Sequence, residues 1–375
     1  MDLTPADALA LRMASLLLAD PPGRGAPEGP ADVAGVVGWF GAMQAQDAAS
    51  AMWSLGARLP GFTAADVQAA LERREALRTW PMRGTVHLVP PRDARWMLDL
   101  MGARALAGAT ARRASLGLTE KVADRAVDVL RAALAGGRRL SRKECLAVLA
   151  EAGIGGGGQF GYHLLWYASQ RGVTCIAPTV GTEQTFVLLD EWAPDPHRPD
   201  RDEALGTIVV RYFRSHGPAT RQDFARWTGL TMADAKRGLA VAGDQLATVK
   251  VDGREMVLDR ALLDAHRTGP AAAGSDDVRA LPGFDEYLLG FKDRSLMVAA
   301  EQMQAIIPGG NGVFQPTFVR GGRVIGTWRR TAARTRTVVE VRPLVRLGAS
   351  DRVRVEDALK PYAYFTGKPV DVRFS

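Results

Sequence analysis

Two glutamines one residue apart, Gln44 and Gln46 in the stretch GAMQAQDAAS, are the first candidates for chemistry. They follow an apolar segment, at a point where a helix would need a cap or a turn. In a continuous helix such residues point about 200° apart, because the helix repeats every 3.6 residues. In an extended or turn segment they point the same way, and the pair then offers hydrogen bonds and dipoles without charge. The alternative is that they are ordinary amides at a surface or helix end.

A second polar run, LRTWPMRGTVHLV, occupies residues 77–89. A proline and a glycine within it indicate a turn. Arg83, Thr85 and His87 are spaced two apart, so we expect their side chains to line one face of a small ribbon. The alternative is an ordinary β-hairpin with a buried tryptophan.

Several classes of site are excluded by the residues present. The two cysteines and five histidines show none of the spacings of zinc or iron–sulfur sites, so we expect no metal and no cofactor. Neither a P-loop nor a GxSxG nucleophile elbow occurs. The start of the chain has no basic leader, and its apolar run is too short to cross a bilayer, so we expect a cytoplasmic protein.

The most regular pattern lies in residues 203–260. Helical periodicity over 203–215 is followed by two shorter segments that Thr220 and Thr231 are placed to N-cap. An alternating stretch then turns at Asp252 and Gly253, a strong hairpin signal. Three helices followed by a hairpin is the order of a winged helix.

The same order recurs upstream in weaker form: in residues 5–90, with one helix expected over Asp32–Met43, and in residues 120–190, where Ser141 is placed to N-cap a helix. A β-rich segment ends the chain. The expected fold class is therefore α+β, with three tandem winged-helix units and a C-terminal β-rich module. We predict the following segments: 1–90, winged helix 1 with the glutamine pair; 91–119, a helical connector; 120–200, winged helix 2; 201–270, winged helix 3; and 280–375, a basic β-rich module.

The charge of the chain is concentrated at one end. Basic residues number 48 and acidic residues 41, for a net charge of +7. Residues 279–375 account for that whole excess, and residues 1–278 are neutral overall. Residues 320–354 contain ten arginines and two acidic residues. This local excess of positive charge favours a polyanionic partner such as nucleic acid. The alternative is a solvated surface. Alternation places Arg334 and Arg336 on one face of a strand.

Four short motifs in order resemble those of the AlkZ/YcaQ type of bacterial DNA glycosylase. They are QxQ, RTWxxRGTxH, LPGFDEYLLGFKDRS and GTWRR, and the resemblance covers residues 5–370. Gln44 and Gln46 match the catalytic pair of that family in its Gln/Gln form. The resemblance implies a C-shaped molecule around a DNA channel, with the pair in the channel and a basic hairpin that helps to hold the DNA.

The implied reaction is hydrolysis of the N-glycosidic bond of N7-alkylated purines in double-stranded DNA, by a monomer. The implied range extends to bulky adducts and interstrand crosslinks, in DNA repair or in self-resistance to a genotoxin. Arg83 and His87 are the candidates for contacts near the lesion or its phosphates. The candidates for clamping the DNA backbone are Arg320, Arg323, Arg329 and Arg330. Asp47 either caps a helix or polarises the water.

Two other functions remain open from the sequence. Winged helices are common in transcriptional regulators, and a non-catalytic DNA-binding regulator would leave the DNA intact. The neutral charge of residues 1–278 also suits a structural or protein-interaction array, which would show no salt-sensitive DNA binding.

Overall fold

The computed structural model describes residues 1–20, 27–156, 159–181, 183–269 and 276–375. The chain forms two compact units, and each is made from separate stretches of sequence. The predicted segment 1–90 is thus divided between them. Unit 1 contains Met1–Phe40, Asp47–Val67 and Leu205–Ser375, and unit 2 contains Gly41–Gln46 and Gln68–Ala204.

Unit 2 is built on a six-stranded sheet in the order β2-β4-β3-β6-β7-β5. Two antiparallel hairpins, β3–β4 and β6–β7, are joined side by side where Arg78 pairs with Ile176. The hairpins predicted for the first two winged helices therefore share one sheet. The strands are β2 (Met43–Gln44), β3 (Leu77–Met82), β4 (Thr85–Val89), β5 (Leu140–Ser141), β6 (Thr174–Val180) and β7 (Glu183–Leu188).

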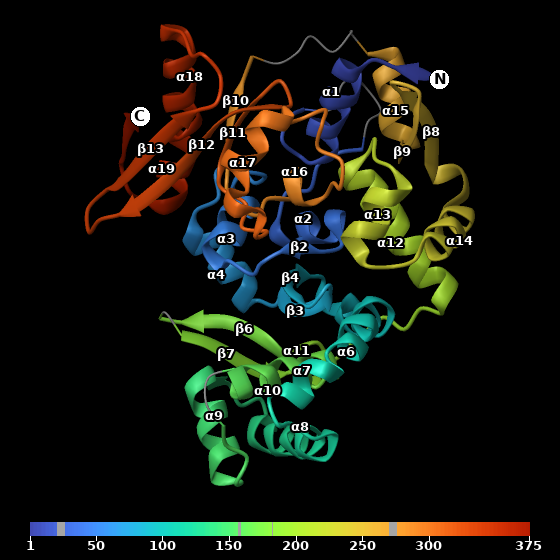
Figure 1. The fold of residues 1–375 in the computed structure, drawn as a ribbon, viewed down its shortest axis with the longest axis vertical. Coiled ribbons are helices and arrows are strands. Elements are labelled where there is room, and N and C mark those ends of the chain that lie inside the picture. The colour runs from blue at the N-terminus through green and yellow to red at the C-terminus, as the bar shows by residue number, and fades with distance from the viewer. Residues whose placement is uncertain (21–26, 157–158, 182, 270–275) are drawn as a thin grey trace. The chain divides into compact units, whose positions relative to one another are not determined.

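Three helices of unit 2, α8, α9 and α10, precede the hairpin β6–β7 and pack against it (Figure 1). This confirms the order of helices and hairpin expected for residues 120–190, and Ser141 N-caps α9 as predicted. Residues 91–115 are helical as expected. The helices are η1 (Pro91–Asp93), α5 (Ala94–Met97), a π-helical turn (Leu98–Gly102), α6 (Ala103–Gly108), α7 (Thr110–Ser115), α8 (Glu120–Leu134), α9 (Arg142–Glu151), α10 (Gln159–Gln170) and α11 (Leu189–Trp192).

The helices and the hairpin predicted for residues 203–260 are present in the structure. Thr220 and Thr231 each accept a hydrogen bond from the third residue of the helix they cap, and both caps are reciprocal capping boxes. Asp252 and Gly253 have φ angles of 47° and 75°, which the tight hairpin turn requires. The elements are α12 (Arg201–His216), α13 (Arg221–Thr228), α14 (Met232–Ala242), β8 (Leu246–Val251) and β9 (Arg254–Asp259).

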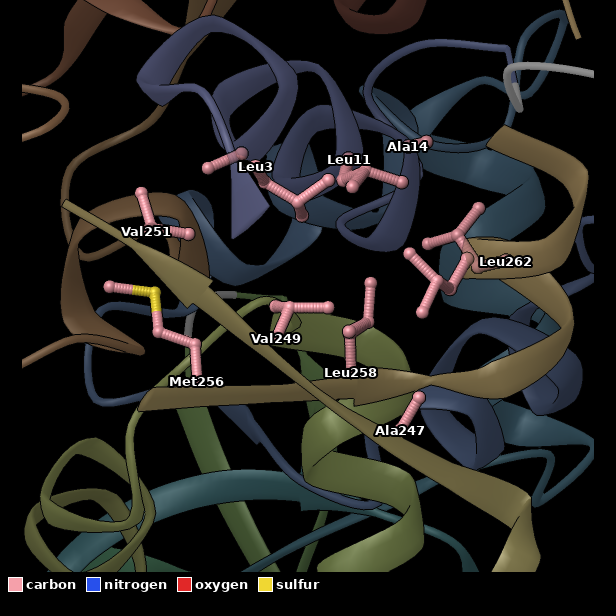
Figure 2. Packing of buried hydrophobic residues seen from close by; sticks show 11 residues of the cluster. Leu3, Leu11, Ala14, Ala247, Val249, Val251, Met256, Leu258 and Leu262 are labelled. Carbon is pink, nitrogen blue, oxygen red and sulfur yellow. The ribbon is translucent and has the colours of Figure 1, made fainter. Parts of the chain in front are cut away.

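A hydrophobic cluster joins the start of the chain to the hairpin β8–β9 and helix α15 (Arg260–Thr268). Strand β1 (Asp2–Leu3) pairs in parallel with β8, and helices α1 (Pro5–Ser15) and α15 cover the hairpin. Figure 2 shows Leu3 and Leu11 from the first segment facing Leu258 and Leu262, and all four are at most 6% exposed. Burial of these side chains from water holds residues 1–15 against residues 246–268.

The C-terminal module is a five-stranded sheet in the order β10-β11-β12-β13-β14, as its β-rich sequence predicted. Helix α18 packs on it. Arg334 and Arg336 do not share a strand face, because both lie in the turn between β12 and β13, and that prediction was wrong. The elements are β10 (Val278–Leu281), α16 (Glu286–Leu289), α17 (Met303–Ile306), β11 (Thr317–Arg320), β12 (Arg323–Ala332), β13 (Thr337–Pro343), α18 (Ala349–Ala358), α19 (Lys360–Thr366) and β14 (Val370–Phe374).

The helix expected over Asp32–Met43 is shorter than predicted. Helix α2 spans Val33–Phe40 and stops at Gly41, whose φ of 80° breaks the helical path. The next residues form strand β2 instead. After it come α3 (Ala48–Gly56) and α4 (Ala64–Glu72).

Candidate active site

The glutamine pair lies at the edge of the unit 2 sheet, in extended backbone. Strand β2 pairs antiparallel with β4, and Gln44 stands directly opposite His87. The pairing continues one residue further, because the backbone N–H of Ala45 donates to the Val86 carbonyl at 2.8 Å. Gln44 and Gln46 therefore flank a buried alanine on a strand edge, the arrangement in which both amides point to the same side.

Three neighbouring strands contribute polar side chains to this one side. Residues directly opposite each other in antiparallel strands share a face. Thr79 on β3 is paired with His87 on β4, which is paired with Gln44 on β2. Thr85 joins the same face because it lies two residues before His87. The sheet thus assembles a polar row from three segments of sequence.

The main chain fixes the orientation of both amides. The Gln44 Oε1 accepts the backbone N–H of Gln46 at 2.8 Å, and the Gln46 Oε1 accepts the backbone N–H of Val86 at 3.1 Å. Since only the oxygen of an amide accepts a hydrogen bond, these contacts determine which end of each amide is the carbonyl. The pair presents two oriented, uncharged dipoles.

His87 supports this face from inside the protein. Its side chain is 0% exposed, and its Nδ1 lies 2.9 Å from the Thr85 carbonyl, which accepts only. Nδ1 therefore carries a proton, and Nε2 lies 3.5 Å from Nη2 of Arg83. The structure buries His87 next to Arg83, and the expected direct contact of His87 with DNA stays a prediction.

Arg83 itself is placed by the turn of the β3–β4 hairpin. Arg83 and Gly84 have φ angles of 54° and 71°, which reverse the chain within two residues. The side chain of Arg83 is partly exposed and reaches back to His87. Arg78 lies on the opposite face of the sheet, where burial lowers the pKa of its guanidinium to about 10 and Nη2 donates to the Ala177 carbonyl.

Asp47 acts as a helix cap. Its Oδ1 accepts the backbone N–H of Ser50 at 2.7 Å, at the start of α3. An acidic residue at this position satisfies a helix N–H and interacts favourably with the helix dipole. Of the two roles considered for Asp47, the structure shows the capping one.

The four C-terminal arginines that are candidates for clamping the DNA backbone differ in their surroundings. Arg320 is engaged in an ion pair with Asp351, 2.5 Å away, and Arg330 donates to the Tyr362 hydroxyl at 3.0 Å. Arg323 and Arg329 are exposed. Adjacent residues of a strand point to opposite faces, so Arg329 and Arg330 do not act from one surface.

A groove of about 450 Å³ lies beside Arg329. Arg329 on β12 stands opposite Glu340 on β13, and Glu340 stands opposite Arg373 on β14. These three side chains therefore share a face of the sheet. Arg342 also lines the groove. Three arginines around one glutamate leave this concave surface basic, which suits a phosphate backbone.

The motif LPGFDEYLLGF of unit 1 is structural. Asp285 accepts hydrogen bonds from both terminal nitrogens of Arg58, at 2.8 and 2.9 Å, and neither side chain is more than 3% exposed. Glu286 accepts the indole N–H of Trp227 at 2.9 Å and lies 3.4 Å from His216. Both acids are therefore committed to buried partners within unit 1.

Metal and thiol chemistry find no support in the described part of the chain. Its His, Cys, Asp and Glu side chains form no group of three or more that could hold a metal ion. Both cysteines are buried, and desolvation raises the pKa of the Cys145 thiol to about 12 and that of Cys175 further still. Among the described helices none is long and apolar enough to span a membrane.

Comparison with known proteins now decides the family. The family model described as DNA glycosylase AlkZ-like matches residues 37–365. The chain belongs to the AlkZ-like DNA glycosylases. A relative from Streptomyces sahachiroi, named interstrand DNA cross-link repair glycosylase, is 32% identical over 270 residues, which cover 67% of this chain and 70% of the relative.

The fold of this AlkZ-like chain matches a solved structure as well. The structure of Streptomyces sahachiroi DNA glycosylase AlkZ superimposes with a TM-score of 0.78 at 26% identity, over the full length of both chains. This confirms the resemblance drawn from the four motifs and the mixed α+β fold class.

Thr79 is the site residue that sequence reasoning missed. It lies between the two residues of the run RTW that attract attention by charge and size. Its even spacing from Thr85 and His87 is interrupted by the bulge and turn that follow it, so alternation alone does not relate them. Only the register of β3 against β4 places it on the glutamine face.

Proposed function

We propose that this AlkZ-like glycosylase hydrolyses the N-glycosidic bond of N7-alkylated purines in double-stranded DNA, with Gln44 and Gln46 as its catalytic pair. The observation that carries the proposal is that main-chain N–H groups orient both carbonyls at the same edge of the sheet, where β2 pairs with β4. Preorganised dipoles of this kind stabilise developing charge without reorganising during the reaction.

The chemistry of the substrate explains why neutral amides suffice. A purine alkylated at N7 carries a positive charge, so the pair of electrons of the C1′–N9 bond leaves with the base and neutralises it. No acid is needed to protonate the leaving group, in contrast to the paired carboxylates of sugar hydrolases. Water forms the new bond to C1′ and then loses a proton to solvent.

Each glutamine has a task in this scheme. One carbonyl accepts a hydrogen bond from the attacking water and holds it in line with C1′. The other aligns its dipole with the positive charge that develops on the sugar in the oxocarbenium-like transition state. The stretch 41–90 contains no lysine, so it offers no amine for a covalent intermediate, which supports a monofunctional enzyme.

Arginines supply the contacts to the DNA backbone. Arg83, held by His87, is placed within the motif that forms the candidate site, and we assign it to a phosphate next to the lesion. Arg323 and Arg329 are exposed and suit the clamp. Arg320 and Arg330 contribute charge but are already bonded to Asp351 and Tyr362.

The substrate range follows from the relative named for interstrand crosslinks. We propose that the protein, as a monomer, also releases bulky N7 adducts and unhooks N7-linked crosslinks, in DNA repair or in self-resistance to a genotoxin. A crosslinked duplex labelled on one strand would separate into single strands on a denaturing gel once one of the two glycosidic bonds has been cut.

The decisive experiment uses a duplex that contains one N7-methylguanine. After incubation with the protein, mild base cleaves the strand at each abasic site that excision has produced. We expect breaks at the modified base, and Gln44→Ala and Gln46→Ala each to slow single-turnover excision at least tenfold, about 1.4 kcal/mol of barrier, with DNA affinity retained.

The matched control is Gln222→Ala, which removes an exposed glutamine of unit 1 and should excise at the wild-type rate. If both site variants also excise at that rate, the pair is not catalytic. If the wild type makes no breaks and instead protects one preferred sequence in footprinting, the protein is a regulator.

A further inference from the structure

Two threonine hydroxyls face the glutamine side of the unit 2 sheet and have no hydrogen-bond partner within the described residues. Both hydroxyl oxygens are buried: Thr79 on β3 is buried as a whole residue, whereas Thr85 on β4 is partly exposed. Thr85 lies next to Val86, whose backbone N–H holds the Gln46 carbonyl. Because Ala45 bonds to Val86, the following residue of that edge, Gln46, comes opposite Thr85.

The hydroxyls of two other threonines in the same sheet are hydrogen-bonded. On the neighbouring hairpin β6–β7, the hydroxyls of Thr174 and Thr185 each lie 2.7 Å from an oxygen that completes a hydrogen bond. A buried hydroxyl without a partner costs free energy, and valine has the same shape without that cost. Stability alone therefore favours valine at positions 79 and 85, so a threonine at either position points to a ligand that its hydroxyl binds.

The reaction supplies such a ligand. The glutamine carbonyls only accept hydrogen bonds, so they bind the protons of a water molecule and leave its oxygen unrestrained. A threonine hydroxyl donates as well as accepts. A donor to the water oxygen occupies one of its two lone pairs and fixes the direction of the other, which is the pair that attacks.

His87 does not fill this role, because both of its ring nitrogens are directed at other groups. Nδ1 lies against the Thr85 carbonyl, and Nε2 lies against Arg83. By fixing the backbone of Thr85, however, the hydrogen bond from Nδ1 also fixes the residue that lies opposite Gln46.

We propose that Thr85 is a further catalytic residue, whose hydroxyl donates to the oxygen of the attacking water while the Gln46 carbonyl accepts one of its protons. This inference rests on the proposed function. The water forms the bond to C1′, the C1′–N9 electron pair leaves with the base, and the excess proton passes to solvent. Thr85 holds the water and exchanges no proton.

The test compares Thr85→Val with Thr85→Ser in single-turnover excision of N7-methylguanine at saturating protein. Thr85→Val should be at least tenfold slower, with the DNA dissociation constant unchanged and the thermal midpoint equal to or above that of the wild type. Thr85→Ser keeps the hydroxyl and should stay within threefold of the wild-type rate. Thr85→Ala serves if the valine variant does not fold, and should show the same loss of rate.

Thr174→Val is the matched control, because Thr174 lies on the neighbouring hairpin β6–β7 and its hydroxyl is hydrogen-bonded to Ser169 of α10. It should lower the thermal midpoint and leave the excision rate of the folded protein unchanged. An active wild type with a Thr85→Val variant at the same rate would overturn the role of Thr85 alone, as would a serine variant as slow as the valine one. An inactive wild type would refute the proposed function and the water site together.

Discussion

Replacing Asp285 with asparagine tests whether the acids of the motif LPGFDEYLLGF are structural. The Asp285 carboxylate accepts from both terminal nitrogens of Arg58, from the Ser54 hydroxyl at 2.7 Å and from the Tyr287 backbone N–H at 2.9 Å. The Arg58 side chain is 0% exposed. Asparagine keeps the shape but leaves the guanidinium buried without a counter-charge.

We expect Asp285→Asn to lower the free energy of unfolding by about 3–5 kcal/mol, the usual cost of removing one partner from a buried ion pair. Against a total stability of about 5–15 kcal/mol, such a loss is large. Urea titration followed by tryptophan fluorescence measures it, with Glu255→Gln as the control. Glu255 pairs with Arg221 at the surface, where both are about half exposed, so its loss should cost less than about 1 kcal/mol.

The excision rate separates structure from catalysis in the same variant. Below its melting temperature, folded Asp285→Asn should excise N7-methylguanine at the wild-type rate, because the carboxylate is enclosed within unit 1. A variant as stable as the wild type would show that the ion pair contributes no net stability. A stable variant that no longer excises would show instead that Asp285 takes part in the reaction, and the assignment of this motif to structure would be wrong.

Two further predictions concern thiols and salt. Since burial raises the pKa of Cys145 to about 12 and raises that of Cys175 as well, thiolate is scarce at pH 8, and a thiol reagent should label neither cysteine until urea unfolds the protein. Labelling of the native protein at the rate of a free thiol would contradict this. Arg329→Ala should reduce the log–log salt slope of DNA binding by about one, while Arg320→Ala, whose side chain is paired with Asp351, should change it less. Equal salt slopes for Arg329→Ala and Arg320→Ala would show that the ion pair with Asp351 does not change the contribution of Arg320 to DNA binding.

Local signals predicted the helical units well. Thr220, Thr231 and Ser141 cap helices where their hydroxyls were expected to do so, and Asp252 with Gly253 turns the third hairpin. Each of these features depends on a few neighbouring residues and on backbone geometry that the residue type itself favours. Such features are readable because no distant contact needs to be known.

The site was only partly readable for the opposite reason. The spacing of Gln44 and Gln46 left helix and strand open, and the decision came from pairing with β4, about forty residues later. The burial of His87 and the position of Thr79 likewise depend on strand register. A one-residue change of register would reverse which side chains share the glutamine face, and sequence alone does not fix it.

The separate stretches that make up each unit bear on how the protein is made. Gly41–Gln46 belongs to unit 2, although the residues on either side of it belong to unit 1. Unit 1 lacks its largest stretch until residues beyond 205 leave the ribosome, whereas every stretch of unit 2 precedes that point. Because chains begin to fold from the N-terminus during synthesis, the glutamine strand has its pairing partner before most of unit 1 exists. The glutamine site would then be formed before the C-terminal arginines have been synthesised.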